Sequence, residues 1–82
     1  MWTEKDNALY AKFIFTDFKK AFAFMTEVAF YAEEHAHHPN WSNVYNTVDI
    51  ALQTHDAGNI VTEKDHALAQ VIEQIYDTYK PA

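Results

Sequence analysis

The apolar residues of the sequence change their spacing at Thr16, and this change restricts the chain to a fold that mixes strands with helices. Before Thr16 they alternate, with Leu9, Ala11, Phe13 and Phe15 on one side of the segment and Tyr10, Lys12 and Ile14 on the other. Such alternation is typical of a half-buried strand. Trp2 to Lys5 is a shorter strand candidate and Asp6-Asn7 is a turn signal, so residues 1–15 are predicted to form a hairpin.

The residues after Thr16 follow helical spacing. Thr16 is a good N-cap, and Asp17 would lie in the first turn, where the helix dipole favours an anion. The apolar stripe that we expect to pack on a sheet consists of Phe18, Ala21, Phe22, Met25, Val28, Ala29 and Ala32. Pro39 disfavours helical geometry at His38, so this helix is predicted to end near His37.

The second half of the sequence repeats the same order of elements. The segment from Trp41 to Thr54 contains neither Gly nor Pro and is too long for one ordinary strand, so a hairpin turn is predicted near Tyr45-Asn46. After a loop at 56–59, Thr62 and Asp65 form a capping box for a second helix. Two strands, a helix, two strands and a helix predict an α+β fold in two layers, with a four-stranded antiparallel sheet and helices packed on one face.

Composition limits the classes of protein to which the chain can belong. One Gly and two Pro leave no place for a linker, so residues 1–82 are expected to form a single domain. The absence of cysteine excludes disulfides and thiolate metal sites and suits a reducing compartment. A formal net charge of −6 argues against a nucleic-acid partner. No apolar run approaches membrane-spanning length and no signal-peptide pattern is present, so we expect no membrane association and a cytoplasmic location.

Four of the five histidines lie in the polar stretch from Glu33 to His55. Imidazole exchanges protons near neutrality, because its unperturbed pKa is about 6.5. Glu33 precedes His37 by four residues, so on a helix the carboxylate would orient the imidazole. Asp65 would face the same sheet from the start of the second helix. The stretch is a candidate acid/base centre, although taken singly Glu33 could be a solvated helix residue, Asp65 a cap and His55 a surface residue.

A metal site is the less favoured interpretation of these histidines. His35, His37 and His38 lack the i, i+4 pair that is typical of helical zinc sites, and no cysteine is available. His35 and His66 are expected to be incidental. We therefore predict no metal.

Several positions of the sequence match a known family: Glu33, His37, His38, Pro39, Tyr45, His55 and Asp65. Their spacing resembles the signature of the pterin-4a-carbinolamine dehydratases, also known as dimerisation cofactors of a hepatocyte transcription factor. The framework W-S-N-V-Y-N-T-V-D-I-A-L-Q-T-H-D-A-G and the later T-E-K-D-H-A-L-A are similar as well, so the resemblance covers nearly the whole chain from Phe13 onward. Two features depart from the family pattern: an N-terminal helical segment of many members is not in this sequence, and the loop from His55 to Asp65 looks one residue longer.

The resemblance implies an enzyme that dehydrates 4a-hydroxytetrahydrobiopterin to the quinonoid dihydropterin, in the recycling of tetrahydrobiopterin for aromatic amino-acid hydroxylases. No cofactor is implied. The catalytic residues implied are His37 and His55 as the acid/base pair, His38 for pterin contact or proton transfer, and Glu33 to orient His37. The substrate-binding residues implied are Pro39, Trp41, Tyr45 and Asp65, although core packing is the better interpretation of Trp41.

The competing interpretation is a protein-interaction module. Members of the family double as transcriptional coactivators through a helical surface, and an acidic domain of this size could act in that way alone. We also expect a homodimer or a homotetramer, because so short a chain buries little surface by itself. The sheet face opposite the helices is the expected contact surface, since it carries Tyr10, Ile14, Val44 and Ala51.

Overall fold

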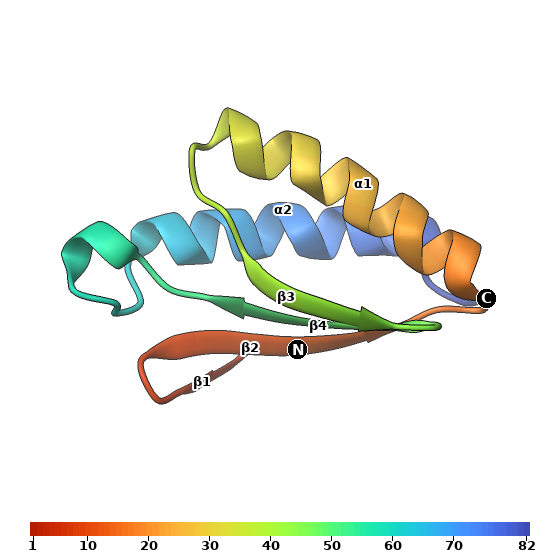
Figure 1. Ribbon diagram of the computed structural model, residues 1–82, viewed down its shortest axis with the longest axis horizontal. Helices are drawn as coiled ribbons and strands as arrows, with labels where there is room; N and C mark the ends of the chain where they lie inside the picture. The colour runs from red at the N-terminus through yellow and green to blue at the C-terminus, as the bar shows by residue number, and fades with distance from the viewer.

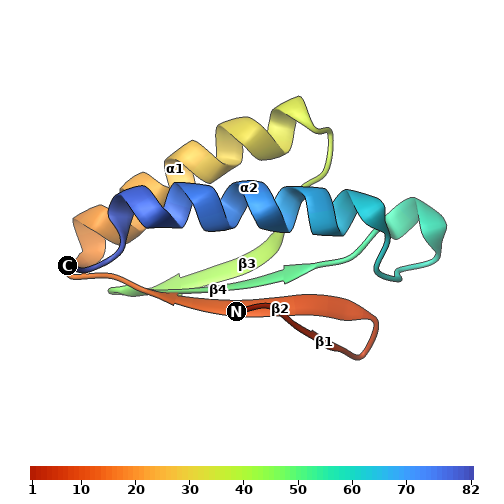
Figure 2. The ribbon, with the colours of Figure 1, turned by 180° about the vertical axis from the view of Figure 1, so that it is seen from behind.

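A computed structural model describes all 82 residues, and it shows one antiparallel sheet with two long helices on the same face (Figures 1 and 2). In chain order the elements are β1 (Thr3–Lys5), β2 (Ala8–Ile14), α1 (Phe18–Glu34), β3 (Asn40–Val44), β4 (Thr47–Leu52), a short 3₁₀ helix (His55–Ala57) and α2 (Glu63–Tyr79). The strands lie in the order β1-β2-β4-β3. The predicted two-layer α+β fold is confirmed. Neither helix is long and apolar enough to cross a bilayer.

The pairing of β2 with β4 builds the floor of the core. Phe13 lies opposite Val48 and Ala11 opposite Ile50, so the inward side chains of the two strands stand next to each other. The predicted alternation is confirmed, because the side of β2 that includes Phe13 is buried while Tyr10 and Ile14 remain 43% exposed on the open face. A one-residue shift of register would turn these apolar side chains to solvent, so burial fixes the pairing.

Helix α1 begins one residue later than predicted. Asp17, not Thr16, is the N-cap: its backbone is extended and its carboxylate accepts a hydrogen bond from the backbone N–H of Lys20 at 2.9 Å. An aspartate at this position satisfies a free N–H and also places a negative charge at the positive end of the helix dipole. Asp17 therefore precedes the first turn as its cap and is not, as had been predicted, part of that turn.

The face that α1 buries is also rotated from the predicted one. Its buried residues are Ala21, Phe24, Val28 and Ala32. Phe24 is fully buried and was not predicted, whereas Phe18 and Phe22 were assigned to the core and are 46% and 55% exposed. The helix has apolar residues on most of its circumference, so spacing alone did not identify the buried side.

The helix ends at Glu34, three residues before the predicted end. The backbone N–H of His37 donates to the carbonyl of Ala32, and that of Ala36 donates to Glu33, both at 3.0 Å. These two bonds form a Schellman motif, in which Ala36 takes the left-handed position with φ of 51°. Glycine usually occupies this position, so the alanine gave no sequence signal for the end of the helix.

The second hairpin and the second helix follow the predictions. The β3–β4 turn lies at Tyr45 and Asn46, and the inward residues of β4, Val48, Ile50 and Leu52, are buried. Thr62 is the N-cap of α2, and Thr62 and Asp65 form the predicted capping box. Leu68, Ala69, Ile72 and Ile75 pack α2 on the core.

Candidate active site

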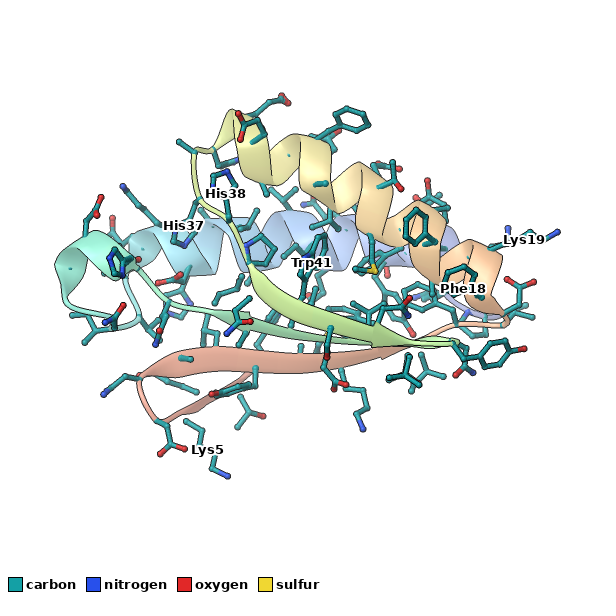
Figure 3. All side chains as sticks on the ribbon, in the orientation of Figure 1. Lys5, Phe18, Lys19, His37, His38 and Trp41 are labelled. Atoms are coloured by element: carbon teal, nitrogen blue, oxygen red, sulfur yellow. The ribbon has the colours of Figure 1, made fainter.

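Three imidazoles meet in a pocket of about 240 Å³, where the end of β4 meets the segment that follows α1 and the first turn of α2. Its lining consists of Ala36, His37, His38, Gln53, Thr54, His55, Asp56 and Lys64. In Figure 3, His37 lies on the side of α2 and His38 on the side of the end of α1. The fold thus brings together His37, His38 and His55 from two separate segments of the chain.

His37 forms a buried pair with Asp65. Its Nε2 lies 2.5 Å from Oδ1 of Asp65, and the two residues are 8% and 0% exposed. The other carboxylate oxygen, Oδ2, accepts hydrogen bonds from the Thr54 hydroxyl and the Thr62 backbone N–H, both at 2.8 Å. Asp65 of the α2 capping box therefore also holds the imidazole of His37, and three hydrogen-bond donors fix the Asp65 carboxylate.

These contacts determine the charge of Asp65. Burial raises the pKa of Asp65, but hydrogen bonds from the Thr62 N–H, the His37 ring and the Thr54 hydroxyl outweigh burial and hold the pKa below its ordinary value of 3.8. Asp65 is therefore ionised at neutral pH. An ionised carboxylate can only accept hydrogen bonds, so Nε2 of His37 carries a proton, and Nδ1 is the atom left for proton transfer.

Glu33 pairs with His38 rather than with His37. Its Oε1 lies 2.9 Å from Nε2 of His38, and the side chains are 80% and 66% exposed. The predicted contact of Glu33 with His37 was wrong because the Schellman motif turns the chain away before His37, so the two residues no longer share a helix face. An exposed pair of this kind adds little stability.

His55 begins the 3₁₀ helix that follows β4, and its Nδ1 lies 3.0 Å from Oδ1 of Asn59. The remaining histidines lie elsewhere. His35 is exposed, and its Nδ1 donates to the carbonyl of Tyr31 at 2.8 Å at the end of α1. His66 is exposed on the first turns of α2. Neither belongs to the pocket lining.

None of the expected substrate-binding residues lines the pocket, and Asp65 reaches it only through its contacts with His37 and Thr54. Pro39 is half-buried in the segment between α1 and β3. Trp41 packs against the core beneath α1 (Figure 3). Tyr45 is 61% exposed in the β3–β4 turn, and the whole length of β4, about 17 Å, separates it from the histidines. Within one chain, Tyr45 and the pocket are at opposite ends of the sheet.

Sequence reasoning missed five residues of the lining: Ala36, Gln53, Thr54, Asp56 and Lys64. Thr54 had a usable signal, since it continues the inward alternation of Val48, Ile50 and Leu52, and a hydroxyl at such a position needs a buried partner. The other missed residues had no such signal in the sequence. No three His, Asp or Glu side chains come close enough together to hold a metal ion.

A larger groove, about 420 Å³, lies on the open face of the sheet. Tyr10, Lys12, Ser42 and Asp49 are among its lining residues, and no histidine is. Its ionised groups are one lysine, one aspartate and the amino group of Met1, and it lacks the cluster of imidazoles that lines the smaller pocket. The smaller pocket is therefore the candidate site for acid/base chemistry.

Comparison with known proteins finds a matching family and similar chains. The family described as pterin 4 alpha carbinolamine dehydratase matches residues 1–75. A protein of Rhizorhabdus wittichii that carries the name pterin-4-alpha-carbinolamine dehydratase is 56% identical over 69 residues, which is 84% of this chain and 70% of the relative. A protein of Christiangramia forsetii with the same name is 49% identical over 77 residues, 94% of this chain and 78% of the relative.

Two solved structures have the same fold. A transcriptional coactivator/pterin dehydratase from Brucella melitensis has a TM-score of 0.87 at 44% identity, over 92% of this chain and 81% of that one. A pterin dehydratase-like protein identified as a RuBisCO assembly factor in the alpha-carboxysome has a TM-score of 0.75 at 25% identity, over 93% and 87%. The names of the similar proteins thus include an enzyme, a coactivator and an assembly factor.

Proposed function

The chain belongs to the pterin 4 alpha carbinolamine dehydratase family, and from this premise we propose that it removes water from 4a-hydroxytetrahydropterins to give quinonoid dihydropterins. The observation that carries the proposal is the pocket in which the buried His37–Asp65 pair lies beside two further imidazoles. The product fits the recycling of tetrahydrobiopterin for aromatic amino-acid hydroxylases.

The reaction requires two proton transfers and no change of oxidation state. The bond from C4a to its hydroxyl oxygen breaks, and the oxygen takes a proton and leaves as water. The proton on N5 is removed, and the electrons of that N–H bond form the C4a=N5 double bond. Acid and base assistance are each typically worth about 10²–10⁴-fold, which suits side chains that titrate near neutrality.

We assign His37 as the base that takes the proton from N5. Its Nδ1 has the free lone pair, because Nε2 donates to Asp65. As the ring gains a proton it becomes an imidazolium, and the ionised Asp65 behind it stabilises that charge. Asp65 then acts through His37, which revises its expected role from direct substrate binding to positioning.

His55 is assigned as the acid that protonates the departing hydroxyl. It lies on the opposite segment of the same pocket and is exposed to solvent, from which its imidazolium form can be regenerated. The exposed His38–Glu33 pair is assigned to pterin contact and proton exchange at the pocket rim. Glu33 thus orients His38 in this proposal.

A second function, as a protein-interaction module, is supported by a different observation. Phe18, Phe22 and Phe30 on α1 are 46%, 55% and 70% exposed, and exposed aromatic side chains on one element indicate a binding surface. The names of the coactivator and the RuBisCO assembly factor are consistent with such a role for this fold. The two functions use different surfaces and are compatible.

The decisive experiment for the enzyme uses 4a-hydroxytetrahydropterin generated in situ by a hydroxylase. We expect the protein to accelerate the ultraviolet absorbance change of dehydration above the spontaneous rate, in proportion to protein concentration. Folded protein that leaves the spontaneous rate unchanged would contradict the enzymatic proposal and leave the interaction module as the better one.

A further inference from the structure

The ring of His55 has one hydrogen-bond partner in the chain, and that partner is a loop asparagine. Its Nδ1 lies 3.0 Å from Oδ1 of Asn59, four residues later. Both side chains are on the surface, so burial does not hold the ring in place. The orientation of His55 therefore depends on how firmly Asn59 itself is held.

The backbone of Asn59 is fixed at three points. Its φ is 60°, a left-handed conformation that asparagine tolerates better than most residues with a side chain. Its N–H donates to the carbonyl of Thr54 at 3.0 Å, and its carbonyl accepts from Nε2 of Gln53 at 3.3 Å. The loop thus returns Asn59 to the residues that directly precede His55, and its amide has a defined place beside the ring.

The contact also selects a tautomer of His55. An amide oxygen only accepts hydrogen bonds, so Nδ1 of the neutral ring must carry the proton, and Nε2 keeps its lone pair. A free histidine side chain prefers the opposite tautomer, with the proton on Nε2. The Asn59 contact therefore works against the intrinsic preference of the ring.

We infer that Asn59 is a positioning residue for His55, which holds the ring in the Nδ1–H tautomer and leaves Nε2 for the substrate. This inference rests on the proposed dehydratase function. With this assignment, the two imidazoles that transfer protons, His37 and His55, have opposite tautomers. His37, bound through Nε2 to Asp65, uses Nδ1, whereas His55, bound through Nδ1 to Asn59, uses Nε2.

Nitrogen-15 NMR of the histidine rings tests the inference without any assay of activity. In the wild-type protein, above the titration of the rings, we expect the His55 signals of an Nδ1–H ring. Asn59→Gly removes the amide and keeps the left-handed backbone, because glycine adopts positive φ freely. In that variant the signals should move to the Nε2–H pattern. Asn59→Asp, which retains an acceptor oxygen, should keep the wild-type pattern.

Kinetics give the second readout. Asn59→Gly is expected to lower kcat by about 5- to 10-fold with KM little changed, because one orienting hydrogen bond is lost and the pocket lining is kept. Asn59→Asp should retain most of kcat. The matched control is Asn7→Gly, at another exposed asparagine with positive φ, 65°, whose side chain makes no hydrogen bond. It should change neither the His55 spectrum nor kcat.

Two results would overturn the inference. One is a wild-type spectrum with the proton on Nε2 of His55, and the other is an Asn59→Gly variant that keeps the wild-type spectrum and kcat. The failure of the dehydratase proposal looks different: the wild-type protein would show no catalysis, while the His55 spectrum would still respond to Asn59→Gly.

Discussion

At the scale of single residues, the site is organised by the partner that each imidazole has. His37 is buried with an ionised aspartate, His38 is exposed with a glutamate, and His55 lies against an amide. The environment of each ring thus differs in charge and in access to water. Three histidines can therefore perform three different tasks in a single pocket.

The lowered pKa of Asp65 predicts how stability depends on pH. Its ionised form is favoured in the folded state, so its contribution is complete above the unfolded pKa, near 3.8, and is lost as the pH falls through the lower folded value. We expect Asp65→Asn to lower the free energy of unfolding by about 2 kcal/mol at pH 7. The loss should shrink on acidification.

Urea denaturation at neutral pH and at about pH 3 measures this difference. The control is Asp49→Asn, since Asp49 is exposed on the open face of the sheet and makes no hydrogen bond through its side chain. Asp49→Asn should have the same free energy of unfolding as the wild-type protein at both pH values. A constant gap between Asp65→Asn and wild type across this range would show that the aspartate does not gain its stability from ionisation.

At the scale of elements, the end of α1 places His37 and His38. The Schellman motif reverses the chain within two residues, so His37 leaves the helix and reaches Asp65 on α2. Ala36 adopts the left-handed conformation that this motif requires, with φ of 51°. A residue with a Cβ is strained in this conformation by roughly 1–2 kcal/mol. This strain is located at the edge of the candidate active site.

Ala36→Gly should therefore stabilise the protein. Relief of the left-handed strain exceeds the entropic cost of a glycine, so we expect the free energy of unfolding to rise by about 0.5–1 kcal/mol. Ala29→Gly, at an exposed position in the middle of α1, should instead destabilise by about 1 kcal/mol. Chemical denaturation of both variants tests the pair, and a loss of stability in Ala36→Gly would contradict the assigned motif.

The elements that the sequence predicted well are those with local signals. The period-two pattern before Thr16 gave the strand and its buried side, and the Thr62–Asp65 box gave the start of α2. The pairing of His37 with Asp65 spans 28 residues and depends on how α2 docks, which no local pattern encodes. The end of α1 was missed because alanine occupies a position where glycine is usual.

At the scale of the whole molecule, the distribution of charge on α1 indicates a second copy as its partner. Lys19 and Lys20 lie in the first turn and Glu33 and Glu34 in the last, so apart from the N-cap Asp17 these charges oppose the preference of the helix dipole. Two α1 helices packed antiparallel would bring each basic end against an acidic end. Phe22 and Phe30, which also belong to the surface proposed for the interaction module, would then be buried, so a second copy and another protein would compete for this surface.

We therefore propose that the chain forms a homodimer through α1, and that the apolar open face of the sheet offers a second contact for a tetramer. In sedimentation equilibrium at micromolar concentration, the wild-type protein should exceed the monomer mass of 9.5 kDa. Phe22→Glu should reduce the mass. Val44→Glu, at a 76% exposed residue of the proposed second contact, should reduce a tetramer to the α1 dimer and no further. A wild-type monomer under these conditions would refute the proposed association.

The proposed dehydration depends on His37 as the residue that takes the proton from N5, and a matched pair of histidine variants tests this role. The measurement is kcat/KM for in situ 4a-hydroxytetrahydropterin, corrected for spontaneous dehydration, on variants shown to be folded by circular dichroism. His37→Ala should lower kcat/KM by about 10²-fold or more, whereas His35→Ala, two residues earlier and outside the pocket lining, should remain close to wild type. Equal losses in the two variants, or no loss in His37→Ala, would contradict the claim.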